Sequence, residues 1–218
     1  MKQDITTVFN IEHPIVLPGM SMVAVPKLVA AVSEAGGLGI LATGPLSADQ
    51  TLSGIREIRS LTDKPFGIGV TLMMPGSKEN AEIALAEKVP VINFSLGKGD
   101  WIVERAHAYG GKVIATVVNE RHALAAQRYG VDALMATGYE AAAHGGPVTS
   151  LVLTPAIADI VDIPVIGTGG FADGRGLIAA MALGGQSIFY HTRKPRSRQN
   201  KTSRNTKGNR RHALYSQI

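Results

Sequence analysis

The stretch Pro164-Val-Ile-Gly-Thr-Gly-Gly-Phe-Ala-Asp-Gly-Arg-Gly176 decides the fold of this chain. Its apolar, β-branched start predicts a strand that ends at Thr168, and a helical segment follows from about Ala172. Gly169 and Gly170 stand between the two, and glycines there let the backbone approach a phosphate without a Cβ clash. The stretch therefore predicts a strand-to-helix turn that binds a phosphate, with a tight turn that binds nothing as the alternative.

Similar apolar runs recur at even intervals along the chain. The segments between them carry apolar residues at helical spacing, for example Leu52, Ile55 and Ile58. Nearly continuous apolar strands are typical of a parallel sheet that is covered on both faces. The predicted strands are Pro14–Met20, Leu38–Thr43, Phe66–Leu72, Val89–Ser95, Lys112–Val118, Asp132–Thr137, Ile163–Thr168 and Ser187–Thr192.

Eight strands with seven intervening helices predict an α/β fold, either a (β/α)8 TIM barrel or a large doubly wound sheet. The even spacing favours the barrel. So do the unusual residues directly after the strands, because a barrel places its active site there. Local helix signals agree: Ser47 is a candidate N-cap for Ala48–Thr62, and Gly110 and Gly130 are candidate helix ends.

The composition excludes several classes of protein. With 218 residues, 45% of them hydrophobic, the chain can bury the core of one domain. It has no cysteine, which excludes a disulfide framework, a thiolate metal site and a cysteine nucleophile. No apolar run is long enough to span a membrane, and the charged start lacks the apolar region of a secretory signal. A cytoplasmic protein without a membrane anchor is expected.

The net charge of +5 comes from the end of the chain. Nine of the 22 Lys and Arg residues lie after Thr192, and no acidic residue follows Asp173. We expect residues 1–193 to form the barrel domain, apparently truncated after its eighth strand. We expect residues 194–218 to be a disordered basic tail without a pattern for the eighth helix. We interpret this tail as aberrant translation in preference to a nucleic-acid-binding arm, so nucleic acid is not an expected partner.

Two further segments are candidates for the site. His144 lies in Gly138–Gly146, a loop of small residues after the sixth strand that leaves room for a planar ligand. An imidazole there can exchange protons near neutral pH. Gly19 and Met20 follow the first strand. A merely exposed histidine and a core methionine are the alternatives. The chain has no Walker motif, no Gly-x-Gly-x-x-Gly after its first strand and no cluster with metal-ligand spacing.

Together these segments resemble the nitronate monooxygenase (2-nitropropane dioxygenase) family, which includes closely similar FMN-dependent enoyl-ACP reductases. The matching stretches occur in family order over residues 1 to about 193. They are His13–Met20, Val32–Ile40, Leu61–Gly67, Gly130–Ala133, Tyr139–Ala141 with His144, and Pro164–Gly176. The resemblance implies a (β/α)8 barrel that binds FMN.

The resemblance also implies roles for single residues. His144 would be the active-site histidine. Alkyl nitronate or nitroalkane and O2 would be the small-molecule partners, giving a carbonyl compound and nitrite. An FMN-dependent enoyl-ACP or NAD(P)H:quinone reductase and an inactive truncated barrel remain as alternatives, and an oligomer is left open. The implied FMN contacts are Gly19, Met20, Gly69, Ala142, Ala143, Gly169, Gly170, Tyr190, His191 and Thr192.

The chain departs from the family pattern at three places. Gly69 stands where the family has a flavin-binding asparagine. Ala142 and Ala143 replace two glycines, which adds two methyl groups near the cofactor. His191 replaces a glycine that approaches the phosphate, and beyond Arg193 the resemblance stops. The His191 side chain either blocks the phosphate or, if protonated, donates to it. The lack of a helix pattern after Arg193 predicts weaker FMN binding than in the family's full-length members.

Overall fold

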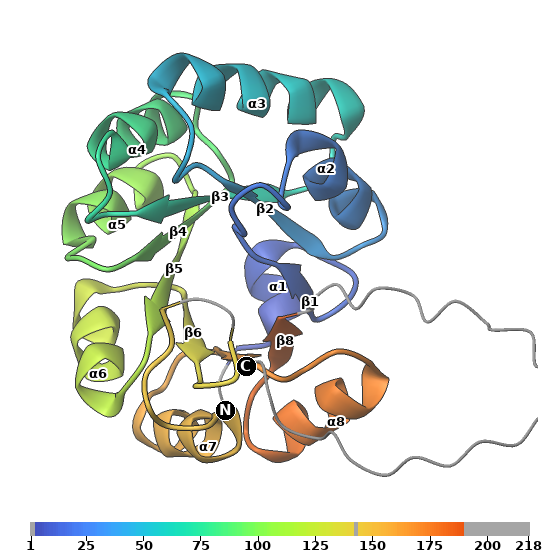
Figure 1. Ribbon diagram of the computed structural model, residues 1–218, viewed down its shortest axis with the longest axis vertical. Coiled ribbons are helices and arrows are strands. Elements are labelled where there is room, and N and C mark those ends of the chain that lie inside the picture. The colour runs from blue at the N-terminus through green and yellow to red at the C-terminus, as the bar shows by residue number, and fades with distance from the viewer. Residues whose placement is uncertain (1–2, 142–143, 190–218) are drawn as a thin grey trace, which may run out of the picture.

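The computed structural model describes residues 3–141 and 144–189. Within them, parallel strands form one closed barrel in sequence order, and helices α2 to α8 surround it (Figure 1). The strands are β1 Ile15–Leu17, β2 Leu38–Ala42, β3 Phe66–Thr71, β4 Val91–Ser95, β5 Lys112–Val117, β6 Ala133–Thr137, β7 Val165–Thr168 and β8 Ser187–Phe189. The helices are α1 Ile5–Phe9, α2 Pro26–Glu34, α3 Ala48–Leu61, α4 Ser77–Ala86, α5 Asp100–His107, α6 Glu120–Tyr129, α7 Ser150–Ile160 and α8 Gly174–Ala182.

The closure of the sheet decides between the two predicted architectures. β8 pairs with β1 in parallel, with Ile15 opposite Ile188, so the sheet has no free edge. The Ser187 hydroxyl donates a hydrogen bond to the Pro14 carbonyl across the same seam, at 2.7 Å. The predicted (β/α)8 TIM barrel is confirmed, and the doubly wound sheet is excluded.

Prolines set the strand boundaries that differ from the prediction. β1 ends directly before Pro18, and β4 and β7 begin directly after Pro90 and Pro164. Proline has no backbone N–H to donate to a strand ladder, so the pairing stops beside it. The predicted strands Pro14–Met20, Val89–Ser95 and Ile163–Thr168 are longer than the observed ones for this reason.

The helix boundaries follow their capping residues. Ser47 caps α3 as predicted, with a reciprocal capping box to Gln50, and Gly130 ends α6 in the left-handed conformation. Gly110 is also left-handed, but it lies two residues beyond the cap of α5 at Ala108. The helix predicted from about Ala172 begins at Gly174, because the Asp173 side chain accepts hydrogen bonds from the first amides of α8.

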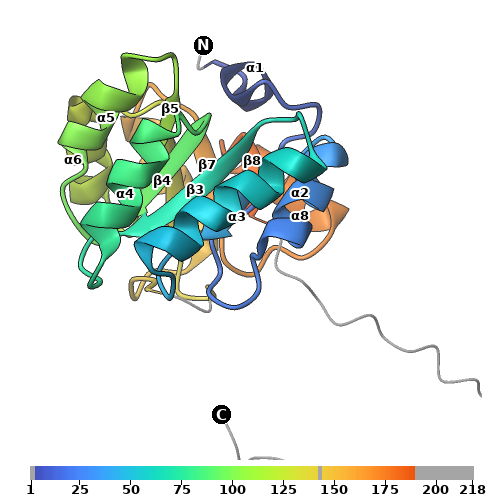
Figure 2. The ribbon, with the colours of Figure 1, turned by 90° about the horizontal axis from the view of Figure 1, so that it is seen from above.

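An N-terminal helix that the sequence pattern did not predict closes one end of the barrel. Ile5 and Phe9 of α1, together with Ile11, are buried against the interior side chains of the barrel. Figure 2 shows α1 at one end of the barrel and the loop after β6 (yellow) at the other. The N-terminal ends of the strands are therefore covered by α1, and the C-terminal ends are the place where TIM barrels carry their active sites. The interior side chains in this cluster are Val16, Leu38, Ile40, Val91, Ile114, Ala133, Met135 and Ile166.

The second, larger core lies between the barrel and its surrounding helices, where Ile55, Ile102 and Ile157 are fully buried against the strands. None of the helices in the described ranges has the length and hydropathy needed to cross a bilayer. The predicted tail from residue 194 lies outside the described residues. So does the position after β8 where a further barrel helix would follow.

Candidate active site

The barrel interior changes from apolar to polar along its axis. Strand alternation points Asn93 and Thr116 inward, two residues beyond the core residues Val91 and Ile114. The Asn93 amide donates hydrogen bonds to the Thr116 hydroxyl at 3.1 Å and to the Ile114 carbonyl at 3.2 Å. Asn93 and Thr116 therefore place polar groups on the barrel axis toward the C-terminal mouth, which is where TIM barrels carry their chemistry.

Thr137 and Thr168 continue this polar layer on the next two strands. They are the last residues of β6 and β7 and lie opposite each other in the strand register. Both point inward, because Met135 and Ile166, two residues earlier, belong to the interior core. Both side chains are buried, and neither hydroxyl has a hydrogen-bond partner among residues 3–141 and 144–189.

The predicted glycine pair follows Thr168 directly. Gly169 has φ +107° and Gly170 has φ +77°, in the left-handed region that strongly favours glycine. A Cβ on Gly169 would lie 2.7 Å from the Ser150 hydroxyl oxygen and 2.9 Å from the Ala141 nitrogen. No described residue accepts a hydrogen bond from the amide of either glycine. The turn thus carries two backbone amides that donate to no described residue and no side chain at either position, which are features of backbone anion sites.

Glu140 fastens the loop after β6 to the start of α7. Its carboxylate accepts hydrogen bonds from the Ser150 amide at 2.8 Å and from the Ser150 hydroxyl at 2.9 Å. Burial raises the pKa of Glu140, but the hydrogen bonds from Ser150 and from its own amide outweigh this, and its pKa is lowered. The Ser150 hydroxyl also contacts the Thr168 carbonyl oxygen at 2.9 Å, so Glu140, Ser150 and β7 form one unit.

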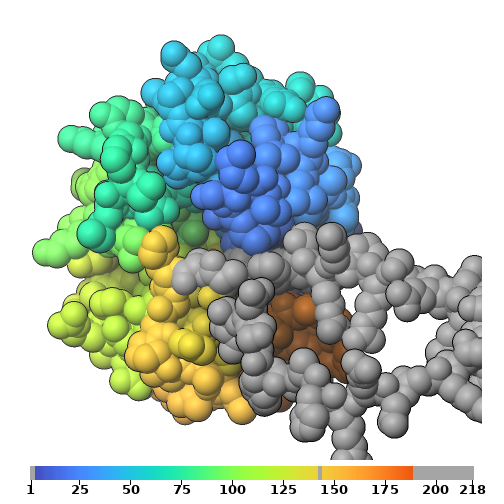
Figure 3. All heavy atoms as spheres, in the orientation of Figure 1, coloured from blue at the N-terminus to red at the C-terminus, as the bar shows by residue number. Residues whose placement is uncertain are grey.

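His144 lies exposed in the loop that Glu140 holds. The base of this loop is closed by a hydrogen bond from the Tyr139 amide to the Val148 carbonyl at 2.8 Å. The His144 side chain is exposed to solvent. The loop and the chain that follows β1 lie on the same face of the molecule (Figure 3, yellow and blue). The structure thus places His144 at the mouth of the barrel, as its position in the sequence predicted.

The segment after β1 brings Gly19 against the third strand. A Cβ on Gly19 would lie 3.4 Å from the Cα atoms of both Ala42 and Gly69. Gly19 and Gly69 therefore face each other through backbone atoms. The Met20 side chain packs partly on the main core, as the alternative interpretation expected, while its carbonyl accepts hydrogen bonds from Val23 and Ala24.

The predicted site residues that the structure describes all lie at the C-terminal mouth: Gly19, Met20, Gly69, His144, Gly169 and Gly170. Ala142, Ala143, Tyr190, His191 and Thr192 lie outside the described residues. The sequence pattern missed Thr137, Thr168 and Ser150, because small hydroxyl residues in a strand or a helix start carry no signal of their own. The described residues contain no group of three or more His, Asp or Glu side chains that could hold a metal ion.

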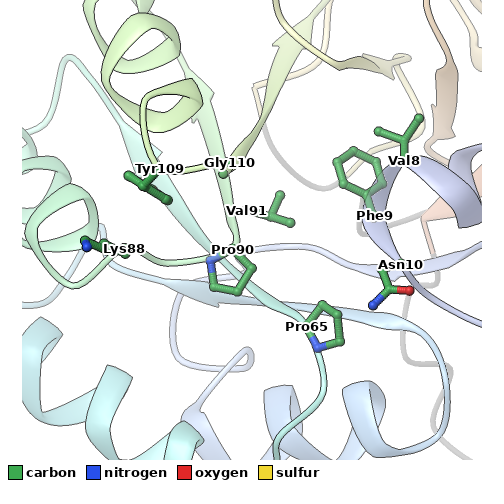
Figure 4. A pocket seen from close by; sticks show the side chains of 10 residues that line it. Val8, Phe9, Asn10, Pro65, Lys88, Pro90, Val91, Tyr109 and Gly110 are labelled. Carbon is green, nitrogen blue, oxygen red and sulfur yellow. The ribbon is translucent and has the colours of Figure 1, made fainter.

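A cavity of about 350 Å³ lies at the opposite end of the barrel, beside α1 (Figure 4). Phe9 and Pro90 line it, together with Tyr109, whose hydroxyl donates to the Val89 carbonyl at 2.9 Å. Burial raises the pKa of Tyr109 to about 12, so this hydroxyl stays protonated at neutral pH. Lys88 is the other titratable group in the lining.

Comparison with known proteins identifies the family of this chain. The sequence profile described as nitronate monooxygenase matches residues 2–84 and 76–210, which is most of the chain. The chain belongs to the nitronate monooxygenase family. The predicted family resemblance is confirmed. The expectation that it stops beyond Arg193 is wrong, because the match extends to residue 210.

Two relatives show how broad the similarity is. The chain is 37% identical over 193 residues to a Rhodococcus jostii dehydrogenase of a hydroxylated methyl-oxo-octahydro-indene-carboxyl-CoA, over 88% of this chain and 55% of the relative. It is 30% identical over 233 residues to a Staphylococcus aureus protein named as a probable nitronate monooxygenase, over 86% of this chain and 66% of that protein. The chain therefore spans about half the length of the first of these family members.

Solved structures of related proteins share the fold. FabK from Thermotoga maritima is 40% identical, with a TM-score of 0.83 over 87% of this chain and 61% of FabK. A nitroalkane oxidase from Streptomyces ansochromogenes is 28% identical, with a TM-score of 0.78 over 84% of this chain and 66% of the oxidase. Proteins similar to this chain are thus named for chemistry on nitro compounds and on a CoA ester.

Proposed function

We propose that this chain is the cofactor-binding barrel of an FMN-dependent oxidoreductase. The observation that carries the proposal is the Gly169–Gly170 turn at the end of β7, with two backbone amides that no described residue uses. A phosphate monoester needs such donors, and the turn after the seventh strand is a recurrent phosphate site in TIM barrels. The Asp173 carboxylate already caps α8, so the glycine amides themselves are the available donors.

The remainder of the mouth fits a planar ring. Gly19 and Gly69 meet through backbone atoms, which leaves a surface on which a ring can lie without meeting a side chain. The inward polar layer from Asn93 to Thr168 lies below it. A Cβ on Gly69 would make only ordinary contacts of 3.4 Å or more, so this glycine leaves space where the family has a flavin-binding asparagine. The described residues fit FMN.

The first candidate reaction is the oxidation of an alkyl nitronate by dioxygen to a carbonyl compound and nitrite. Bound FMN supplies the electron transfer for it. His144 accepts the α-proton when the substrate arrives as a neutral nitroalkane, and an exposed imidazole suits that task because imidazoles exchange protons near neutral pH. Glu140 and Ser150 hold the His144 loop against β7, so the proton acceptor stays at the mouth.

The second candidate is the oxidation or reduction of a bulky acyl thioester, or NAD(P)H-dependent quinone reduction. Large apolar side chains surround the mouth with high exposure, among them Met22 at 83%, Met73 at 77% and Tyr139 at 69%. They follow β1, β3 and β6, so one apolar substrate could contact them together. The names of the CoA dehydrogenase relatives favour this candidate, since they describe a fused-ring CoA ester.

Purification and anaerobic stopped-flow spectroscopy test these proposals. The 218-residue chain should purify yellow or take up FMN with a bound-flavin absorption spectrum. Bleaching of the bound flavin by an alkyl nitronate, but not by NADH or NADPH, would support the first candidate. Bleaching by a nicotinamide cofactor or by a saturated acyl-CoA would support the second. A chain that folds but never binds FMN would refute both.

A further inference from the structure

Thr137 and Thr168 form a matched pair at the top of the barrel interior. They end neighbouring strands, lie opposite each other in register, and are 4% and 2% exposed. Side chains opposite each other on adjacent parallel strands stand about 5 Å apart. Both side chains point toward the barrel axis, at the strand ends directly before Gly169 and Gly170.

Neither hydroxyl makes a hydrogen bond to the described part of the protein. A buried hydroxyl without a partner destabilises the folded state, and most such groups in proteins are satisfied. The inward polar side chains on β4 and β5 are satisfied, because Asn93 and Thr116 bond to each other. The inward hydroxyls at the ends of β6 and β7 lack such a partner among the described residues, so a ligand can supply one.

We infer that the Thr137 and Thr168 hydroxyls together bind the polar pyrimidine edge of the flavin ring. This inference rests on the proposed FMN function. The phosphate belongs to the Gly169–Gly170 amides beyond the strand end, so the inward hydroxyls meet the ring and not the phosphate. The dimethylbenzene edge of the ring has no acceptor, whereas the pyrimidine edge has two carbonyl oxygens at a spacing close to that of the strands. The pair thereby fixes which edge of the ring enters the mouth.

Three valine variants separate this role from a structural one. Thr137→Val and Thr168→Val remove one hydroxyl each with little change of shape. Thr154→Val is the control, because the Thr154 hydroxyl is also buried without a partner but lies on α7, outside the barrel interior. FMN affinity is measured by quenching of flavin fluorescence, and folding by the thermal midpoint of the chain without cofactor. The absorption maximum of bound FMN reports on hydrogen bonds to the ring.

Each barrel variant should bind FMN roughly three- to tenfold more weakly and shift the flavin absorption band. Without cofactor, all three valine variants should be at least as stable as the original chain, because an unpaired polar atom has been removed. Thr168→Ser, which keeps the hydroxyl, should restore affinity. Thr154→Val should leave affinity and spectrum unchanged.

The outcomes distinguish this inference from the function on which it rests. If the original chain binds FMN and both barrel variants bind it equally well with unchanged spectra, the hydroxyl pair is not a flavin contact. If the barrel variants lose stability without cofactor, the hydroxyls hold internal water, and the inference is wrong. If the original chain folds and binds no FMN, the proposed function fails and the inference fails with it.

Discussion

The Glu140 carboxylate accepts hydrogen bonds from the amide and the hydroxyl of Ser150, ten residues further along the chain, at 2.8 and 2.9 Å. The pair spans the base of the His144 loop and places a negative charge at the N-terminus of α7, where the helix dipole favours it. Because the Ser150 hydroxyl also reaches the Thr168 carbonyl, the loop position is linked to the end of β7.

Replacing Glu140 with Gln should lower the free energy of unfolding by about 1 kcal/mol or less at neutral pH, since the site is largely exposed. The folded pKa of Glu140 lies below its ordinary value of 4.5. The stabilisation is therefore fully present above that value and disappears as pH falls through the lower folded pKa. Urea unfolding of both chains at stepwise lower pH measures this. A difference that persists in strong acid would contradict the charge-based explanation.

Gly169→Ala should be far more damaging than Gly170→Ala. Both glycines have positive φ, so an alanine at either position is strained. In addition, a Cβ on Gly169 would lie 2.7 Å from the Ser150 hydroxyl oxygen, whereas a Cβ on Gly170 would meet only Glu140 side-chain atoms, the nearer at 3.5 Å. We expect a loss of roughly 1–2 kcal/mol for Gly170→Ala from backbone strain, and more for Gly169→Ala. FMN affinity should fall more than tenfold for Gly169→Ala.

A helix glycine provides the control for this pair. A Cβ added to Gly174 would have no heavy atom within 4 Å, and this residue does not have positive φ. Gly174→Ala should leave FMN binding unchanged and keep or raise the thermal midpoint. If all three alanine variants changed FMN affinity and the thermal midpoint equally, FMN binding would not depend on the conformation of the Gly169–Gly170 turn.

Gly69→Asn should strengthen FMN binding without loss of stability. Atoms around a Cβ at this position are no closer than 3.4 Å, and the family pattern has an asparagine there. The added amide can donate to the ring, and a side chain in a strand reduces the entropy that glycine loses on folding. Gly67→Asn is the comparison, since its Cβ would lie 3.1 Å from the Val91 carbonyl oxygen. That variant should destabilise the barrel, as thermal unfolding would show.

His144→Ala should reduce turnover of a neutral nitroalkane far more than turnover of the preformed nitronate. The nitronate has already lost the proton that a base would remove. Oxygen consumption with each substrate measures the two rates, and His122→Ala on the outer surface of α6 is the control. Equal losses with both substrates would assign His144 a positioning role instead.

Phe9→Ala should cost about 3–5 kcal/mol of stability while FMN affinity remains unchanged, because α1 lies at the end opposite the site. Denaturant unfolding with and without FMN separates the two effects. The exposed neighbour Thr7, changed to Ala, should alter neither quantity. If fully folded Phe9→Ala protein bound FMN more weakly, the two ends of the barrel would be energetically coupled.

The strands were predictable because each is a nearly continuous apolar run with clear punctuation. Three strands were predicted too long. Pro18, Pro90 and Pro164 mark the positions where their pairing stops, but the apolar pattern continues past them. Helix α1 escaped prediction because five residues are too few for a helical period. Its position depends on burial of Phe9 against residues far along the chain.

The candidate site was predictable where backbone geometry demands glycine, as at Gly169 and Gly170. The roles of Thr137 and Thr168 depend on a pairing between strands that are separated by helix α7, and on the lack of a partner for either hydroxyl among the described residues. Threonine is common in strands, so neither residue stands out in the sequence. The bond between Glu140 and Ser150 likewise appears only once the loop has folded back.

The seam between β1 and β8 has a consequence for how the protein is made. The Ser187 hydroxyl closes on the Pro14 carbonyl across 173 residues of sequence. On a ribosome, which adds about 5–20 residues per second, the first strand must wait until all of the intervening residues have been added before its partner emerges. During that interval Ile5, Phe9 and Ile11 lack the completed barrel interior against which they pack. Their apolar surface is then open to chaperones or to other nascent chains. The emergence of β8 therefore ends the period in which this barrel is most prone to aggregate.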